Sequence, residues 1–535
     1  MSLIPEPRCS TCLIGRNLAL VASLLLIPLC VASLEIRAQE SKETSTANAH
    51  LNRAKQMLAA DNFSGAREEL EEAIKADPNL GEAYVHLGMV EYQTGELAKA
   101  VQHLRRAVEL LPDSFDAHYG LAMVFLRDQR GEEGMRELQR ARQINPRSPD
   151  AAFNLGIVLL GRGKAEEAAT LFRATRTLGP NRPDISFYMV YAELEQGRVE
   201  EAHREAEEGT KAFGKDFRWR LGVGRLFLEH ANARIALSHL EEALRLQPSS
   251  AEARQLLAAA RIQLQDPAGA LALLATAPAA EDHYLRASAL YLERRYGEAD
   301  QECRQALQAE PDEPKYLLLE ARIAQHAGEH QEALNLLSQA LAAAPEWSEL
   351  YYSQGVSYYL LRRYEDARRS LARAIELDPR ASRALFVYAA TLVNQGKNRE
   401  GEEYLHRALA LEPSNARFYY HLGALLLRDN RPAEAQKAFE EAVRLKQDYA
   451  PPHYQLGKLL VRSNRPGPAA QELETAVHLQ PDLAQAYYQL SRAYTLLKDN
   501  DKASRALAIF NQLKRRQTDE DQEFFEGIRK ELETP

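Results

Sequence analysis

The sequence predicts an all-α protein in which pairs of antiparallel helices stack into a solenoid. A chain of 535 residues is too long for a single hydrophobic core, so it either holds several domains or has a core that grows lengthwise. Alanine, leucine, glutamate, arginine and glutamine dominate the composition, which favours amphipathic helices over strands. Prolines recur at a constant spacing, and such a period indicates a repeat array.

The prolines fix the register of the repeat. A proline ends a helix because it lacks a backbone donor and restricts the residue before it. Successive prolines stand 34 residues apart, or 68 where one position has lost its proline, and a shortened unit separates two series. The first series is Pro78, Pro112, Pro146, Pro180 and Pro248, and the second is Pro311, Pro345, Pro379, Pro413 and Pro481.

Small residues agree with this register. In the unit at residues 81–112, glycine and alanine allow two helices to approach closely, while leucines fill the space between them. Glycines between the two helices suit a left-handed turn, as at Gly95, Gly163, Gly197, Gly328 and Gly396. The unit resembles the tetratricopeptide repeat at Tyr84, Leu87, Gly88, Ala100, Leu104, Ala107 and Pro112.

The resemblance implies a right-handed α-solenoid, the tetratricopeptide superhelix, of about fourteen units over residues 47–515. One unit, at residues 251–279, is shortened at Pro278, either as a harmless deletion or as a functional hinge. We expect residues 516–535 to form a capping helix over the last apolar face, and residues 39–46 to form a polar tether. First helices are expected to begin near residues 47, 81, 115, 149, 183, 217, 251, 280, 314, 348, 382, 416, 450 and 484.

Residues 1–38 have the pattern of an export segment. Residues 18–34 form an uncharged apolar run that follows two arginines, and small residues near Ala38 suit a signal peptidase. The run is also long enough, at the short limit, for an uncleaved signal anchor, whereas lipidation at Cys30 fits the preceding residues poorly. We expect a cleaved signal peptide and, in a bacterial host, a periplasmic or secreted protein; anchoring to the inner membrane is the alternative.

In the tetratricopeptide family the fifth residue of each first helix points into a concave groove. Aromatic residues occupy most of these positions here, and tyrosine offers a stiff contact area with a hydroxyl group that suits an extended peptide or a partner helix. Because tyrosine is common there in the family, ordinary repeat sequence is the competing interpretation. The aromatic candidates are Tyr119, Phe153, Phe187, Tyr284, Tyr352, Phe386, Tyr420, Tyr454 and Tyr488.

Cations accompany the aromatic residues in the C-terminal part of the expected groove. They favour an acidic partner segment, since arginine holds carboxylates through charge-assisted hydrogen bonds. The alternative is that these cations pair with local acids such as Glu434 or Asp482 and remain solvated. The lysine and asparagine set with which some family members clamp a C-terminal carboxylate is absent. The basic candidates are Arg417, Arg428, Lys458, Arg462 and Arg492.

The sequence favours a binding protein over an enzyme. It has no phosphate loop, HExxH motif or nucleophile elbow, and few residues outside the array are left for a catalytic domain. His326 and His330 have helical spacing without a third metal ligand, and Cys303 is expected to be a buried small side chain. We therefore expect no cofactor and no metal.

The partner is expected to be another protein. A net charge of −9 without a basic stripe argues against nucleic acid. The leading hypothesis is a non-enzymatic interaction scaffold of the cell envelope that binds a peptide segment or a partner helix. The alternative is a glycan- or peptidoglycan-binding accessory protein of polysaccharide export. Membrane association would run through residues 18–34.

Overall fold

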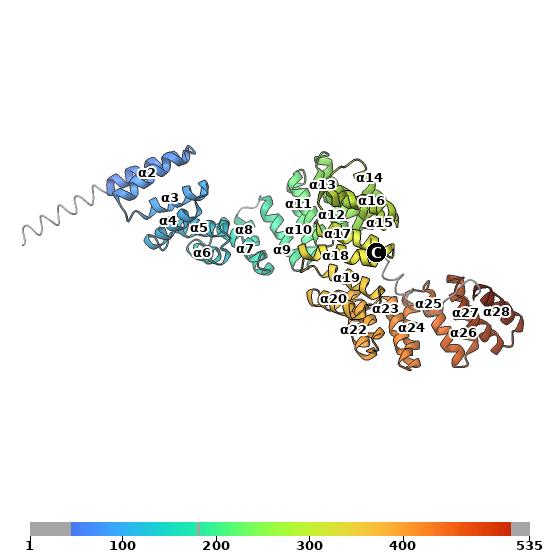
Figure 1. Ribbon diagram of the computed structural model, residues 1–535. Coiled ribbons are helices and arrows are strands. Elements are labelled where there is room, and N and C mark those ends of the chain that lie inside the picture. Colours follow the sequence, from blue (N-terminus) through green and yellow to red (C-terminus); the bar gives the residue numbers. More distant parts are fainter. Residues whose placement is uncertain (1–43, 179–181, 515–535) are drawn as a thin grey trace, which may run out of the picture. The chain divides into compact units, whose positions relative to one another are not determined.

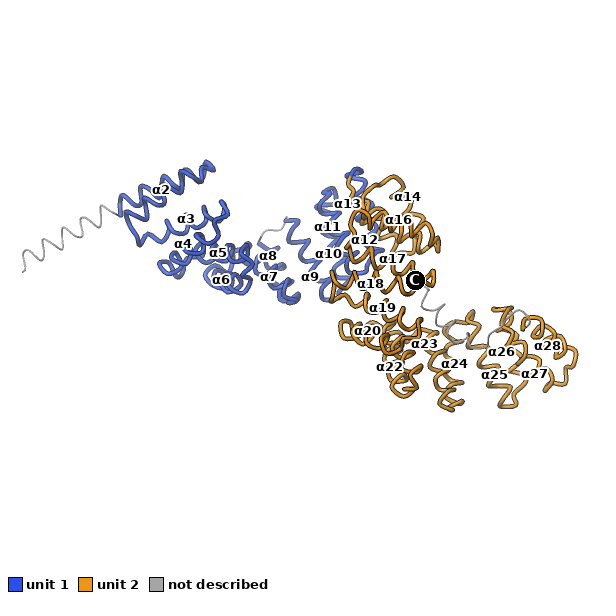
Figure 2. The backbone as a smooth tube through the Cα atoms, in the orientation of Figure 1, with its two compact units in different colours: residues 1–249 blue, residues 250–535 orange. Residues whose placement is uncertain are grey.

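The computed structural model describes residues 44–178 and 182–514, which form helices joined by short turns. The chain divides into two compact units, residues 1–249 (unit 1) and residues 250–535 (unit 2), shown in Figure 2. No strand occurs among the described residues. The expected all-α solenoid of paired helices is thereby confirmed, whereas the predicted export segment and capping helix lie outside the described residues.

Unit 1 consists of six helix pairs, which Figure 1 shows in chain order. They are a helix at residues 44–59 with α2 (Phe63–Ala76), α3 (Gly81–Thr94) with α4 (Leu97–Leu110), α5 (Phe115–Arg127) with α6 (Gly131–Ile144), α7 (Pro149–Leu160) with α8 (Ala165–Leu178), α9 (Pro183–Glu195) with α10 (Val199–Phe213), and α11 (Phe217–Glu229) with α12 (Ala233–Leu246).

Unit 2 contains eight such pairs among its described residues. They are α13 (Ala251–Gln263) with α14 (Pro267–Leu274), α15 (Ala280–Leu292) with α16 (Tyr296–Ala309), α17 (Pro314–His326) with α18 (His330–Ala343), α19 (Ser348–Leu360) with α20 (Tyr364–Leu377), α21 (Ser382–Asn394) with α22 (Asn398–Leu411), α23 (Ala416–Arg428) with α24 (Pro432–Leu445), α25 (Ala450–Arg462) with α26 (Pro466–Leu479), and α27 (Ala484–Leu496) with α28 (Asn500–Lys514).

The helix ends follow the proline register. From the second pair on, each first helix begins at the residue expected from the register. Most second helices end two residues before a proline, as α4 does before Pro112 and α26 before Pro481; α10, α14, α24 and α28 do not. One expectation is wrong: residues 44–46, which were assigned to the polar tether, are helical, so the first helix starts earlier than residue 47. The second helix α14 has only eight residues.

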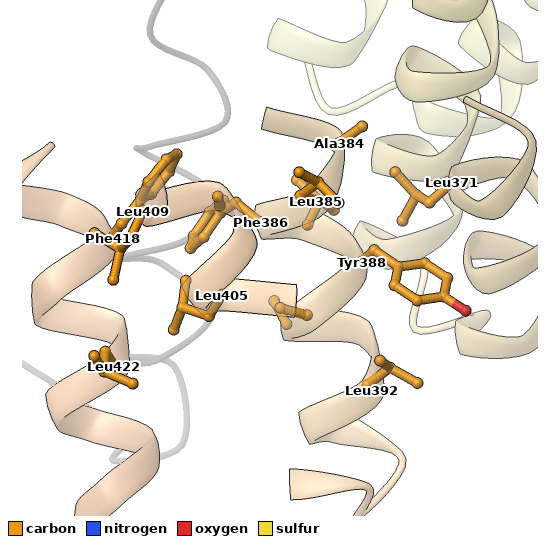
Figure 3. Close-up of a cluster of buried hydrophobic side chains, with 14 of the residues drawn as sticks. Leu371, Ala384, Leu385, Phe386, Tyr388, Leu392, Leu405, Leu409, Phe418 and Leu422 are labelled. Atoms are coloured by element: carbon orange, nitrogen blue, oxygen red, sulfur yellow. The ribbon is translucent and has the colours of Figure 1, made fainter. Parts of the chain in front are cut away.

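Small residues let the two helices of a pair approach closely. A Cβ atom added at Gly88 of α3 would lie 2.5 Å from Leu104 Cγ of α4, and one at Gly423 of α23 would lie 2.6 Å from Phe439 Cε1 of α24. Both distances are far below van der Waals contact, so glycine is required at these positions. In unit 2 the buried side chains of α19 to α25 join into one cluster, part of which Figure 3 shows.

Every described helix pair turns through a residue with positive φ. Five of the turns use the glycines predicted for that role, with φ between 70° at Gly197 and 84° at Gly95. The other nine use a side-chain-bearing residue with φ between 55° and 63°. Aspartate and asparagine adopt the left-handed conformation readily, but it is unfavourable for the other six residues, so at those six turns the geometry is imposed by the packing of the two helices and not by local preference. The nine residues are Asp61, Gln129, Ala231, Gln265, Arg294, Arg362, Asn430, Asn464 and Lys498.

None of the helices within residues 44–178 and 182–514 combines the length and the apolar character that a membrane span requires.

Candidate functional site

The aromatic residues at the fifth positions of unit 1 pack between neighbouring first helices. The hydroxyl of Tyr119 on α5 accepts a hydrogen bond of 3.0 Å from Asn154 Nδ2 on α7. Phe153 on α7 is 7% exposed, and the guanidinium of Arg182 lies 5.0 Å from its ring centroid. Phe187 on α9 stands against α11, because a Cβ at Gly222 would lie 2.9 Å from the Phe187 ring. These rings therefore join one pair to the next.

The fifth positions of unit 2 repeat this arrangement with more burial. Phe386 on α21 stacks on Phe418 of α23 with ring centroids 5.1 Å apart, and both rings belong to the cluster in Figure 3. Tyr284 on α15 lies 5.1 Å from Tyr316 on α17. Tyr352, Phe386 and Tyr454 are between 5% and 8% exposed. The sequence predicts that these rings point into a groove, but most of their area is used in packing.

The rings near the end of the array are less covered. Tyr420 on α23 is partly buried against Phe439 and Tyr449, with centroid distances of 5.9 and 5.6 Å. Tyr488 on α27 is 42% exposed and contacts Phe510 of α28 at 5.2 Å. Among the predicted aromatic residues, all of which lie in the described part of the chain, only Tyr488 is exposed.

Four of the five predicted cations of the C-terminal part form no ion pair with an acid among the described residues. Within the described residues, no ion pair involves Arg417, Arg428, Arg462 or Arg492. Glu434, the expected alternative partner, instead binds Arg431 at 2.6 Å. Lys458 lies over the ring of Tyr454, with its Nζ 5.6 Å from the centroid. Arg428 borders a small apolar cavity of about 20 Å³ beside Phe386.

A larger cavity opens along the first helices in the middle of unit 2. We call it the first-helix hollow; it has a volume of about 510 Å³ and is bordered by α13, α15, α17, α19 and α21. Two predicted residues, Tyr284 and Tyr352, line it, and Tyr291 of α15 and Trp347 before α19 add two further rings. Its size and its mixture of rings with a few polar groups are typical of a ligand pocket, for which about 300–1,000 Å³ is usual.

The charges in the first-helix hollow are predominantly positive. Lys315, Arg322 and Arg383 line it together with a single carboxylate, Glu349, which forms an ion pair with Arg322. Lys315 Nζ binds Glu281 at 2.6 Å. Arg383 is exposed and lies over the ring of Tyr352, 5.1 Å from its centroid, without an ion pair to any carboxylate in the described chain. Its guanidinium is therefore available to an anionic group.

The burial of the rings and the nearby charges shift several pKa values in this hollow. Burial raises the pKa of Tyr284 and of Tyr352, although Arg383 lowers that of Tyr352 in part. Burial acts to lower the pKa of Lys315, but its hydrogen bond to Glu281 and the negative charge of that residue raise it on balance. The tyrosines thus stay neutral and Lys315 stays charged at neutral pH.

The sequence-based predictions missed the cations of the first-helix hollow because they considered cations only in the C-terminal repeats, where Arg417 stands at position two and Arg492 at position nine of its first helix. Lys315 and Arg383 are the second residues of α17 and α21, and Arg322 is the ninth residue of α17. Positions two, five and nine lie on the same face of an α-helix. Applying positions two and nine to the middle repeats as well therefore finds these three residues.

Other chemistry-bearing residues do not form a metal site. Within the described ranges, no three or more histidine, cysteine, aspartate and glutamate side chains are placed to hold a metal ion. Cys303 is fully buried, as expected, and its Sγ donates to the Tyr316 carbonyl oxygen at 3.4 Å. His326 stacks on Tyr296 with ring centroids 3.5 Å apart.

The fold and the repeated unit define an α-solenoid scaffold of the tetratricopeptide class. The chain matches the tetratricopeptide repeat family at residues 51–115, 224–283, 389–450 and 454–518, at 91–155 and 159–226, and at 348–381. It belongs to this family. Proteins of the family are generally non-enzymatic scaffolds for protein–protein interaction, and the repeats support the same role and protein partners here.

Solved structures with related folds include a chain of the crystal structure of the APC/C hetero-tetramer Cut9-Hcn1. It has a TM-score of 0.45 and 14% sequence identity, and the match covers 85% of this chain and 98% of that chain. A crystal structure of MamA protein has a TM-score of 0.30 and 24% identity, over 32% of this chain and 93% of that chain. No curated protein matches the chain.

Proposed function

We propose that the protein is a non-enzymatic interaction scaffold of the cell envelope that binds an extended segment or a helix of a partner protein along its first helices. The observation that carries this proposal is the first-helix hollow, in which Tyr284, Trp347 and Tyr352 stand beside a cation without a carboxylate partner. Aromatic and arginine side chains of this kind dominate the binding energy of protein interfaces.

The charge of the hollow favours a partner segment that carries carboxylates. Arg383 can donate two parallel hydrogen bonds to a carboxylate while its stem covers the Tyr352 ring. Arg417, Arg462 and Arg492 extend the positive character towards the end of the array, since they too lack ion pairs within the described residues. An acidic segment that contacts both regions would gain affinity from each.

The burial of the fifth positions favours a protein partner over a glycan. A sugar ring stacks on the open face of an aromatic side chain, but Phe153, Tyr352, Phe386 and Tyr454 expose 8% or less of their surface. A peptide segment needs less ring area, because it also exchanges hydrogen bonds and ion pairs with residues such as Arg383 and Gln325.

The binding proposal is tested by reversing the charge of Arg383. We expect Arg383→Glu to weaken partner binding at least tenfold, because an approaching carboxylate would meet a like charge. Arg369→Glu on the second helix α20 is the matched control, since Arg369 is 74% exposed and does not line the hollow. The partner is isolated by crosslinking from the envelope fraction and titrated against both variants. Equal affinities for the two variants would contradict the proposal.

The envelope location rests on the apolar run at residues 18–34 and the small residues that follow it. We expect the mature protein to begin near residue 39 and to reside in the periplasm or outside the cell. N-terminal sequencing of the protein from its host tests the cleavage. A mature chain that begins at Met1 and fractionates with the inner membrane would support the signal anchor instead.

A further inference from the structure

A second cavity of unit 2 opens on the second helices, away from the groove residues described above. We call it the second-helix hollow; it lies between α16 and α18, with α17 at its base, and its volume is about 670 Å³. None of its lining residues lines the first-helix hollow, although α17 contributes to both, for example with Leu319 to the first-helix hollow and with Ile323 to the second-helix hollow.

The second-helix hollow is acidic. Asp300, Glu320, Glu329 and Glu332 line it, against one guanidinium, Arg304. Four carboxylates around one cation leave an excess of negative charge in a concave surface, which concentrates the local field. The hollow is therefore complementary to a cation.

Glu320 is the one acid of this hollow that is almost fully buried. The residue is 8% exposed, and its Oε1 accepts a 3.3 Å hydrogen bond from Arg304 Nε, whereas its buried Oε2 has no hydrogen-bond partner. Burial raises the pKa of Glu320 to about 7, and the adjacent Asp300 contributes to the rise. Arg304 is a cation beside this carboxylate, but it leaves the second carboxylate oxygen without a donor.

Arg304 occupies part of the position that a ligand would take. Its Nη2 binds Asp300 Oδ1 at 2.8 Å, so its guanidinium bridges Asp300 and Glu320. The Arg304 side chain is nevertheless 65% exposed, so its guanidinium is easily solvated once another guanidinium takes over the two carboxylates. It can therefore leave the two carboxylates to another guanidinium at small cost.

We propose that the second-helix hollow binds an arginine side chain of a partner protein, whose guanidinium replaces Arg304 on Asp300 and also satisfies the unpartnered oxygen of Glu320. The planar guanidinium suits this site for two reasons. It can span two carboxylates with parallel hydrogen bonds, and it can lie against the stacked rings of Tyr296 and His326 at the rim. A metal ion suits it less, since the described residues offer no set of three ligands at metal distances.

This site is distinct from the proposed groove function. The first-helix hollow would hold acidic side chains and the second-helix hollow a basic one, so one protein could engage two partner surfaces. If the second-helix hollow does not bind arginine, the proposed binding in the first-helix hollow is unaffected, and the reverse also holds. The reason is that Arg383 lines only the first-helix hollow and Glu320 only the second-helix hollow.

The probe for the test is a pentapeptide with central arginine between glycines, acetylated, amidated and carrying a photoreactive group. It is crosslinked to the full chain at pH 8, and mass spectrometry locates the label. We expect arginine-dependent labelling within α16–α18 that falls at least tenfold in Glu320→Gln, which preserves the shape but removes the charge. Glu310→Gln, at an exposed acid outside the hollow, is the matched control and should label as the parent does.

Two further variants separate ligand binding from a structural role. Arg304→Ala removes the internal competitor, so the probe should bind about two- to fivefold more tightly, as expected for the loss of an exposed ion pair. If the Glu320–Arg304 pair has only a structural role, Arg304→Ala should not tighten the binding of the probe. Labelling by a citrulline or lysine peptide at the same level as by the arginine peptide would overturn the proposal, as would unchanged labelling in Glu320→Gln.

The pH dependence of binding provides an independent test. A cation prefers the ionised carboxylate, so the probe should bind about tenfold more weakly at pH 6 than at pH 8 when Glu320 has a pKa of about 7. The other charged or titratable groups that line the hollow or face Glu320 are His326 and Tyr296 at the rim, Asp300, Arg304, Glu329, Glu332 and the buried thiol of Cys303. Because a histidine can also gain charge over this range, His326→Gln is measured alongside. The pH dependence should persist in His326→Gln and vanish in Glu320→Gln; the reverse result would refute the assignment.

Discussion

Replacing Ala231 by glycine should stabilise the helix pair α11–α12, although an alanine-to-glycine change usually destabilises a protein. Ala231 forms the turn between these helices at φ 58° and is exposed, so that its methyl group contributes no packing. The left-handed conformation costs a residue with a side chain about 1–2 kcal/mol, whereas glycine adopts it freely. The greater entropy of the unfolded chain with glycine lowers the stability by about 0.5–1 kcal/mol. The net gain in the free energy of unfolding of the helix pair is therefore about 0.5–1 kcal/mol.

The gain in stability should be measured at the amides of this helix pair and not by global unfolding, because a long repeat array does not unfold in a two-state transition. Native-state hydrogen exchange of the α11 and α12 amides should slow by about two- to fivefold. The control is Ala174→Gly in the middle of α8, an exposed helical position in the same unit, where exchange should accelerate by about fivefold for a cost of about 1 kcal/mol. Faster exchange in Ala231→Gly would refute the view that the turn is imposed by helix packing.

Three further predictions concern buried side chains of unit 2. Gly423→Ala should cost about 1–3 kcal/mol, measured by hydrogen exchange in α23 and α24, because the added Cβ would lie 2.6 Å from the Phe439 ring. Cys303 should react with a thiol reagent roughly 100-fold more slowly in the folded protein than in urea, since burial removes access and raises the pKa of the thiol; mass spectrometry of timed samples measures this rate. Glu320→Gln should raise the free energy of local unfolding of α16–α18 at pH 8 by about 1–2 kcal/mol. The folded Glu320 carboxyl keeps its proton up to about pH 7 and an unfolded glutamate only to about 4.5, so the parent loses stability as the pH rises between these values and the variant does not.

The helix pairs could be predicted because their signals are local. The prolines end the second helices, and Gly88 and Gly423 occupy contacts that no larger residue fits. The nine turns without glycine could not be predicted in the same way. At Arg294 or Lys498 the left-handed turn follows from the packing of two helices against each other, and nothing in the residue type indicates it.

The candidate site was predicted in part. The fifth positions do lie where first helices meet, but the sequence could not show that a ring such as Phe386 is covered by Phe418 and His421 of the next first helix. The first-helix hollow depends on residues from several repeats, and its cations occupy positions two and nine of their helices. The charge of the second-helix hollow likewise arises from three helices, and the burial of Glu320 is visible only in the folded chain.

The central claim is that a partner protein binds along the first helices of unit 2. A photocrosslinking amino acid placed at Ser288, which lines the first-helix hollow, tests it most directly, with the same amino acid at Arg369 of α20 as the control. We predict that the Ser288 variant captures one partner protein in its native host, that Arg383→Glu abolishes this capture, and that the Arg369 variant does not capture that partner. Capture of the same partner from both positions, or capture at Ser288 that Arg383→Glu leaves unchanged, would contradict the account.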